Sequence, residues 1–132
     1  LRVRTRSGER TLSVAEIERL PTFQVTTSTF WPGDDGTYQG VLLADFLKLT
    51  GIDGAKEIRV TAIDGFSQII PSSDWQRWPV VLATRRDGKP LTIRAKGPAR
   101  VIYPRDMDPQ LSESVYRLRW VWLIKLIESV EN

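Results

Sequence analysis

Apolar residues recur at every second position in several short stretches of the chain, which is the spacing of half-buried β-strands. Phe23, Val25, Thr27 and Thr29 alternate in this way, and β-branched residues favour a strand there. The segment 119–127 is apolar on both faces and fits a buried strand or a buried helix; its β-branched and aromatic content favours the strand. The predicted strands are 23–29, 58–63, 68–70, 80–84, 91–95, 100–103 and 119–127.

Two stretches carry the signals of short helices. Ser13 and Glu16 form a capping box, in which each side chain bonds the backbone N–H of the other residue, and Pro21 stops the helix that they open. The segment 42–49 places apolar residues at helical spacing and ends at Gly51, a residue suited to a left-handed C-cap. Loops or turns are expected at Gly33–Gly36, Asp64–Gly65 and Asp87–Gly88.

Many short strands with few, brief helices predict an α+β fold with mixed β-sheets. The Asp87–Gly88 turn is expected to join two of the strands as a β-hairpin. Parallel βαβ winding is not expected, because the helices are too few to cover a sheet. No repeat, low-complexity segment or linker divides residues 1–132, so the chain is expected to form one domain.

The composition excludes several kinds of chemistry. The chain has no cysteine and no histidine, so zinc, copper and non-haem iron sites lack their usual ligands and thiol nucleophiles are impossible. Serine also lacks the histidine that commonly activates it. A net charge of +3, with basic residues scattered among acidic ones, does not favour nucleic-acid binding.

The compartment is an expectation from the start of the chain and its composition. The sequence begins at Leu1 and not at methionine, which favours removal of a signal peptide or upstream segment. The absence of cysteine is compatible with an oxidising compartment, where a stray thiol is a liability. No apolar run approaches the roughly 20 residues that span a bilayer, so no membrane insertion is expected.

A series of short motifs runs through the chain in order. An aromatic-Gln-Gly step enters the apolar helix, an Asp-Gly-aromatic turn leads to Ile-Pro, and a hairpin precedes a Gly-Pro-Ala-Arg segment. The motifs are Tyr38–Leu43, Asp64–Phe66, Ile70–Pro71, Asp87–Pro90 and Gly97–Pro104, closing with Tyr116, Arg119, Trp122 and Leu123. From about Arg10 onward the series resembles the molybdopterin-binding domain of the sulfite oxidase superfamily. The resemblance implies the fold of that domain, with mixed β-sheets and a few short helices.

The chain departs from that superfamily at one position. In catalytic members, a cysteine at the end of the early strand ligates molybdenum. Counting back from Trp31 and Gly40 places this position on Thr27, or on Thr26 or Ser28 if the loop shifts. A threonine hydroxyl stays protonated near neutral pH and is a poor substitute for a soft thiolate. We therefore expect no bound metal and no molybdenum catalysis.

The resemblance extends to a subgroup of small exported proteins that have this fold, no cysteine ligand and a threonine-rich strand leading to tryptophan. It includes periplasmic proteins that bind free pterins and control a membrane receptor making or degrading cyclic di-GMP. This implies a non-catalytic, periplasmic pterin-binding protein. Its implied partners are a pterin and the periplasmic domain of a membrane diguanylate cyclase or phosphodiesterase.

A pterin is a flat aromatic bicycle, so its site needs an aromatic face and a few fixed polar groups. Trp31 is the candidate stacking wall, or else a tryptophan at the edge of the core. The hydroxyls of Thr27 and Thr29 are candidate ring contacts, although threonine is also simply a good strand residue. Asp64 can accept two hydrogen bonds from an amino-pyrimidine edge, but capping its own turn is the favoured role. Phe66 fits the core and the pocket equally well.

Four further candidates come from segments that approach the cofactor in the superfamily. Arg100 and Arg105 are expected to bind an anionic group or a carbonyl of the ligand, with Tyr103 beside them. Arg100 as a surface cation is the alternative. Arg119 is expected to line the pocket or to pair with a carboxylate such as Asp106 or Asp108.

Trp75 and Trp78 are expected in an exposed turn. Exposed tryptophan near arginine is typical of protein interfaces, and the alternative is a tryptophan pair covering the edge of a small core. Two other functions therefore stay open beside pterin binding. One is a molybdopterin-dependent oxidoreductase with an unusual metal ligand, and the other is a pure protein-interaction domain whose pocket has collapsed.

Overall fold

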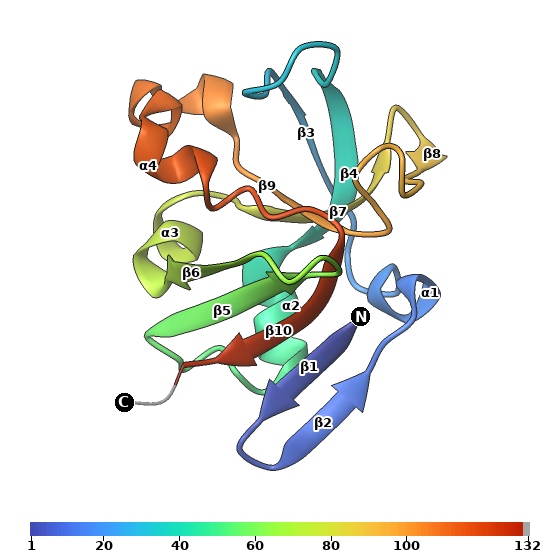
Figure 1. Cartoon of the computed structure of the whole chain (residues 1–132), viewed down its shortest axis with the longest axis vertical. Helices are drawn as coiled ribbons and strands as arrows, with labels where there is room; N and C mark the ends of the chain where they lie inside the picture. The colour runs from blue at the N-terminus through green and yellow to red at the C-terminus, as the bar shows by residue number, and fades with distance from the viewer. Residues whose placement is uncertain (131–132) are drawn as a thin grey trace.

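The computed structural model describes residues 1–130, which form two β-sheets with short helices packed around them (Figure 1). This is the α+β architecture that the hydrophobic pattern predicts. None of the helices in this part of the chain is long and apolar enough to cross a membrane.

The first sheet has the strand order β2-β1-β10-β5-β6. Its neighbours are antiparallel except β1 and β10, which run parallel with Val3 opposite Ile127. The alternation pattern does not predict β1 or β2, because Val3 is the one buried residue of β1 and every residue of β2 is exposed. The strands are β1 (Arg2–Thr5), β2 (Gly8–Thr11), β5 (Glu57–Ala62), β6 (Ser67–Pro71) and β10 (Ile124–Ser129).

The second sheet is antiparallel and has the order β3-β4-β7-β8, with β9 paired to β7. The predicted hairpin at Asp87–Gly88 joins β7 to β8. Gly88 takes a φ of 82°, and Asp87 a φ of 50°, which such a tight turn demands. The strands are β3 (Phe23–Thr27), β4 (Gly36–Leu42), β7 (Val81–Arg86), β8 (Lys89–Pro90) and β9 (Arg100–Ile102).

Both predicted helices are confirmed with their caps. The Ser13 hydroxyl accepts from the Glu16 N–H at 3.1 Å, and the Glu16 carboxylate accepts from the Ser13 N–H at 3.2 Å. The longer helix ends at Gly51, whose φ of 80° is left-handed. The helices are α1 (Val14–Ile17), α2 (Leu43–Thr50), α3 (Ser72–Arg77) and α4 (Ser114–Arg117), with 3₁₀ turns η1 (Arg105–Met107) and η2 (Pro109–Ser112).

The predicted strand at 91–95 is wrong, because the hairpin partner ends at Pro90. Beyond it, the carbonyl of Thr92 accepts hydrogen bonds from the N–H groups of Ala95 and Gly97. Leu91 still bonds the Thr84 carbonyl of β7, but after it these turn bonds bend the chain back and no further ladder bond to β7 is formed within residues 1–130.

The prediction of a strand over 119–127 is correct only from Ile124 onward. The residue before it, Leu123, has a φ of 52°, which breaks the extended conformation. Its N–H bonds the carbonyl of Lys96, and the carbonyl of Val121 accepts from Val101. The stretch that carries Trp120 is thus irregular, and its backbone is bonded to β9 and to the loop before β9.

The expected exposed turn around Trp75 and Trp78 is also wrong. The residues after Pro71 form α3, and the two tryptophans are 8% and 6% exposed. The Trp78 N–H donates to Asp108, and its ring packs on Tyr116. The alternative, a tryptophan pair covering the edge of the core, is therefore correct.

Gly40 gives a direct test of the contact between β4 and β7. A Cβ at this position would overlap the carbonyl oxygen of Leu82 and the backbone of Ala83, and backbone cannot move aside cheaply. We predict that Gly40→Ala lowers the free energy of unfolding by at least about 2 kcal/mol, measured by urea denaturation. Gly54→Ala is the control, because a Cβ there meets open space. Equal stability of the two variants would contradict this strand contact.

Candidate functional site

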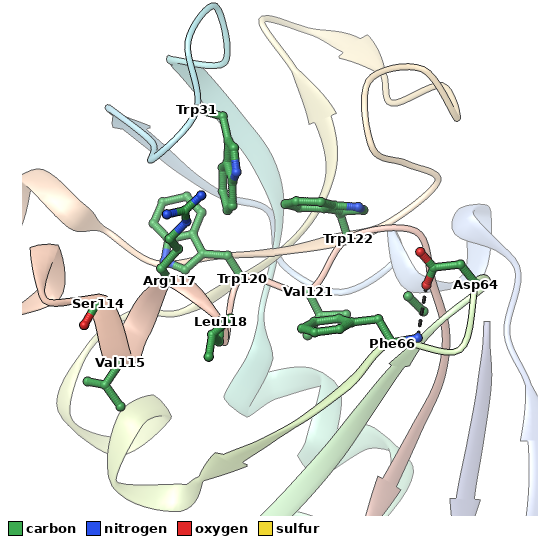
Figure 2. A pocket seen from close by; sticks show the side chains of 11 residues that line it. Trp31, Asp64, Phe66, Ser114, Val115, Arg117, Leu118, Trp120, Val121 and Trp122 are labelled. Atoms are coloured by element: carbon green, nitrogen blue, oxygen red, sulfur yellow. Dashed lines mark hydrogen bonds between the residues drawn. The ribbon is translucent and has the colours of Figure 1, made fainter.

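A pocket of about 650 Å³ opens between the β5–β6 turn, the loop after β3 and the segment around α4 (Figure 2). The volume lies within the range of small-ligand sites. Its lining is mainly apolar and aromatic, and the pocket is open. The lining residues are Trp31, Ala62, Asp64, Phe66, Ser114, Val115, Arg117, Leu118, Trp120, Val121 and Trp122.

Aromatic rings form most of the wall. Trp31 meets Trp122 edge to face at a centroid distance of 4.8 Å and Trp120 at 5.9 Å. Figure 2 shows Trp31, Trp122 and Phe66 along the wall of the pocket, with Asp64 beside Phe66. Aromatic rings of this kind can stack on a flat ligand.

Few polar groups face this space. Asp64 Oδ1 accepts the Phe66 N–H at 3.1 Å, which is the expected turn cap. Its Oδ2 has no hydrogen bond among residues 1–130 and remains able to accept one from a ligand. Arg117 and Ser114 are exposed at the mouth. Asp64 therefore caps its own turn, as favoured, and it can still accept a hydrogen bond from a ligand.

The loop that carries Trp31 is fixed by a buried ion pair. Asp34 in this loop receives two hydrogen bonds of 2.9 Å from the guanidinium of Arg100 on β9. Arg100 is fully buried and also bonds the Tyr38 hydroxyl at 3.2 Å, while Lys96 lies 3.4 Å from Asp34. Arg100 is thus neither a pocket residue nor a surface cation. It holds the loop in place.

Burial and the ion pair together shift the pKa values of Asp34 and Tyr38. Burial by itself raises the pKa of Asp34, but the hydrogen bonds and charge of Arg100 outweigh it and lower the pKa from 3.8 to about 2. Burial raises the pKa of Tyr38 from 10.0 to about 12. Asp34 is therefore charged, and Tyr38 neutral, across the physiological range.

Thr27, Thr29 and Arg105 also secure this loop and do not line the pocket. The Thr27 hydroxyl donates to the Ser28 carbonyl at 2.9 Å, and the Thr29 hydroxyl to the Trp31 carbonyl at 3.3 Å. Arg105 donates to the Thr29 carbonyl at 2.9 Å, and its guanidinium carbon lies 4.5 Å from the centre of the Phe30 ring. Their polar groups already have partners within the protein.

Tyr103 and Arg119 meet at a second buried carboxylate. The Tyr103 hydroxyl donates to Asp74 at 2.7 Å, and Arg119 donates to the same oxygen at 2.9 Å. Arg119 therefore pairs with a carboxylate, as the alternative expected, but that carboxylate is Asp74 and not Asp106 or Asp108. Burial, followed by the charge of Asp74, raises the pKa of Tyr103 well above its usual value.

Of the predicted site residues, the structure brings Trp31, Asp64 and Phe66 to the pocket. Sequence reasoning did not select Trp120 and Trp122 as site residues, although Trp122 belongs to the closing motif. The predicted strand over 119–127 puts both side chains on one face, but nothing in the sequence shows that this face meets a cavity. A high tryptophan content, five in the chain, was the available signal.

The comparisons with known proteins agree with this architecture. The family model of the oxidoreductase molybdopterin binding domain matches residues 1–128, so the match also includes the residues before Arg10. The crystal structure of the sulfane dehydrogenase SoxCD from Paracoccus pantotrophus has a similar fold, with a TM-score of 0.71 and 16% identity. The similarity covers 100% of this chain and 38% of that chain. Among curated proteins, none matches significantly.

The Asp34–Arg100 pair predicts a defined loss of stability in acid. The folded pKa of Asp34 is about 2 and its ordinary value 3.8, so its stabilising contribution is complete above pH 4 and is lost as the pH falls to 2. The loss is about 2 kcal/mol. At pH 7, Asp34→Asn should lower the free energy of unfolding by about 3 kcal/mol or more, because Arg100 stays buried without its counter-charge.

Urea denaturation of the wild type and Asp34→Asn from pH 7 to pH 2 measures both effects. Exposed Asp53, changed to Asn, is the matched control. If Asp34→Asn loses as much stability between pH 4 and pH 2 as the control variant does, the ion pair does not have the assigned role.

Proposed function

Because this chain belongs to the family of oxidoreductase molybdopterin-binding domains, we propose that it binds a free pterin in the tryptophan-lined pocket, without a metal and without catalysis. The observation that carries the proposal is the pocket itself. Its wall combines aromatic rings with the carboxylate of Asp64, which has one oxygen able to accept a hydrogen bond from a ligand. These are the features that a flat, amino-substituted bicycle requires.

Stacking supplies the main contact in this proposal. The ring of a pterin would stack on the aromatic wall to which Trp31, Trp122 and Phe66 belong (Figure 2). Phe66 is 45% exposed, so covering it with a ligand removes apolar surface from water, which favours binding.

Asp64 supplies the polar recognition. The amino-pyrimidine edge of a pterin presents adjacent N–H donors, and a carboxylate accepts such donors through charge-assisted bonds. Asp64 Oδ1 is partly used by the turn, while Oδ2 lies at the pocket with no bond among the described residues. The same residue therefore supports the turn and binds the ligand.

The residues at the expected metal position do not fit molybdenum. Thr26 shares a hydrogen bond of 2.8 Å with Thr37, Thr27 donates to the Ser28 carbonyl, and Ser28 bonds the carboxylate of Asp106. Each candidate hydroxyl is neutral and already has a partner. With no cysteine and no histidine in the chain, no soft thiolate or imidazole can replace them.

Asp64 gives a direct test of pterin binding. Asp64→Asn should weaken the binding of free pterin by about tenfold, because an amide carries no charge. Asparagine still caps the turn, so folding is retained. Titration of purified protein, followed by quenching of pterin fluorescence, measures the affinity.

Asp53→Asn, exposed and outside the pocket, should bind pterin like the wild type. A wild-type protein that does not bind pterin at all would sink the proposal. Molybdenum detected by elemental analysis, in protein expressed with molybdate, would overturn its metal-free part.

The proposal also includes export to the periplasm and signalling to a membrane receptor that controls cyclic di-GMP. The resemblance to small exported proteins supports it, and so does the exposed apolar rim of the pocket. Phe66, Val115 and Leu118 are 45%, 50% and 54% exposed. Side chains of this kind at a pocket mouth are typical of a docking surface whose contacts a ligand can alter.

The rim gives the corresponding test. Leu118→Asp should abolish capture of the periplasmic domain of the cognate diguanylate cyclase or phosphodiesterase in a pull-down, because a charge there must lose its water on docking. Ile93→Asp, on an exposed residue away from the pocket, is the control. Capture that is unaffected by both Leu118→Asp and added pterin would contradict the signalling role.

A further inference from the structure

We infer that Lys96 is a positioning residue of the pocket, whose ammonium group and backbone carbonyl together hold Trp122 in the aromatic wall. Lys96 does not itself line the pocket, so it acts on a ligand through Trp122. The effect on ligand affinity rests on the proposed function, whereas the contact between the two side chains is tested on the protein without ligand.

The ring of Trp122 has no hydrogen bond to orient it. The side chain lines the pocket and is partly exposed, and its indole N–H has no partner within residues 1–130. Its ring meets Trp31 edge to face at 4.8 Å, and the Lys96 Nζ lies over it at 5.7 Å from the ring centre. Because Trp31 is itself on a loop, the ring depends on Lys96 for a contact outside that loop.

The ammonium group lies at the distance of a cation–π contact. A cation within about 6 Å of a ring centre is attracted to the negative face of the ring, and the indole attracts it most strongly. The side chain of Lys96 is 28% exposed, so part of its surface is removed from water and the attraction is less screened. This contact favours one orientation of the Trp122 ring over others.

The ion pair with Asp34 does not by itself explain the place of Lys96. Asp34 already receives two hydrogen bonds of 2.9 Å from Arg100, whereas Lys96 lies 3.4 Å from it. A partly exposed pair of this kind contributes little to stability. The contact instead keeps the ammonium beside the loop that carries Trp31 while it also covers Trp122. Lys96 therefore joins two parts of the aromatic wall.

The backbone of Lys96 holds the chain next to Trp122 at a second point. Leu123 directly follows Trp122, and its N–H donates to the Lys96 carbonyl at 3.0 Å. Both residues of this bond are left-handed, with φ of 73° at Lys96 and 52° at Leu123. Residues with a side chain adopt this conformation at a cost, and it persists where surrounding contacts impose it, often at binding sites. The strain on both sides of the bond agrees with a positioning role.

Substitutions at Lys96 separate its charge from its packing. Lys96→Met keeps a long side chain and removes the charge, and should weaken the binding of free pterin by about fivefold. Lys96→Arg keeps the charge and should restore the affinity to within about twofold of the wild type. All three residues have a Cβ, so the left-handed backbone is equally costly in each. Affinity is measured by quenching of pterin fluorescence, and urea denaturation shows that each variant folds.

Lys89→Met is the matched control, because Lys89 is exposed and outside the pocket; it should bind pterin like the wild type. Lys96→Met binding pterin as tightly as the wild type would overturn the inference. Equal losses of affinity in Lys96→Met and Lys96→Arg would also overturn it, because they would show that the charge has no role.

A double-mutant cycle tests whether Lys96 acts through Trp122. In a Trp122→Leu background, Lys96→Met should cause no further loss of affinity, because the ring on which the ammonium acts is gone. A second loss of about fivefold in that background would show that Lys96 acts on the ligand by another route, and would overturn the positioning role.

Nuclear magnetic resonance tests the contact without any ligand. The ε-methylene protons of Lys96 should resonate upfield of those of the other lysines, because the ring current of Trp122 shields protons above its face. This shift should disappear in Trp122→Leu. The same Lys96 resonance in both proteins would overturn the inference. A wild type that does not bind pterin would refute the proposed function alone, since this measurement on the free protein still decides whether Lys96 holds the ring.

Discussion

The buried ion pair between Arg100 and Asp34 is the interaction on which the form of the pocket depends. The loop from Ser28 to Asp35 has no regular backbone pairing, yet it presents Trp31 at a fixed place beside Trp120 and Trp122. A fully buried guanidinium demands a counter-charge at one position, and the loop supplies it. Net stability is not the main contribution of such a pair. It specifies one loop conformation among many.

Hydrogen bonds around the ion pair extend this control along the loop. Arg86 binds the carbonyl groups of Gly33 and Asp35, and Asp106 binds both the N–H and the hydroxyl of Ser28. These contacts come from different strands and turns of the chain. The position of the aromatic wall is therefore set by residues that do not themselves touch the pocket.

Local signals in the sequence predict the elements that local chemistry determines. The capping box at Ser13, the C-cap at Gly51 and the turn at Asp87–Gly88 all lie where the sequence places them. The turn role of Asp64 follows from the same kind of signal. Each depends on residues a few positions apart, so no knowledge of the fold is needed to find it.

Long-range partners account for what could not be predicted. Arg100 and Arg119 are credible ligand-binding residues in the sequence, but each meets an aspartate from a distant segment. Leu123 breaks a strand-like pattern because its conformation is set by a contact with Lys96. Tertiary contacts therefore place Trp120 in the pocket wall, and the hydrophobic periodicity of the sequence does not predict that position.

The parallel pairing of β1 with β10 has a consequence for how the chain folds. Arg4 and Glu128 are 124 positions apart in the sequence and bond each other across these strands. During synthesis, the β1–β2 hairpin is made first and exposes an unpaired edge until β10 emerges from the ribosome. β10 is the middle strand of this sheet. A chain that ended before Ile124 would thus lack the central strand of this sheet. Its β1–β2 hairpin would keep an unpaired edge, which could pair with other incomplete chains.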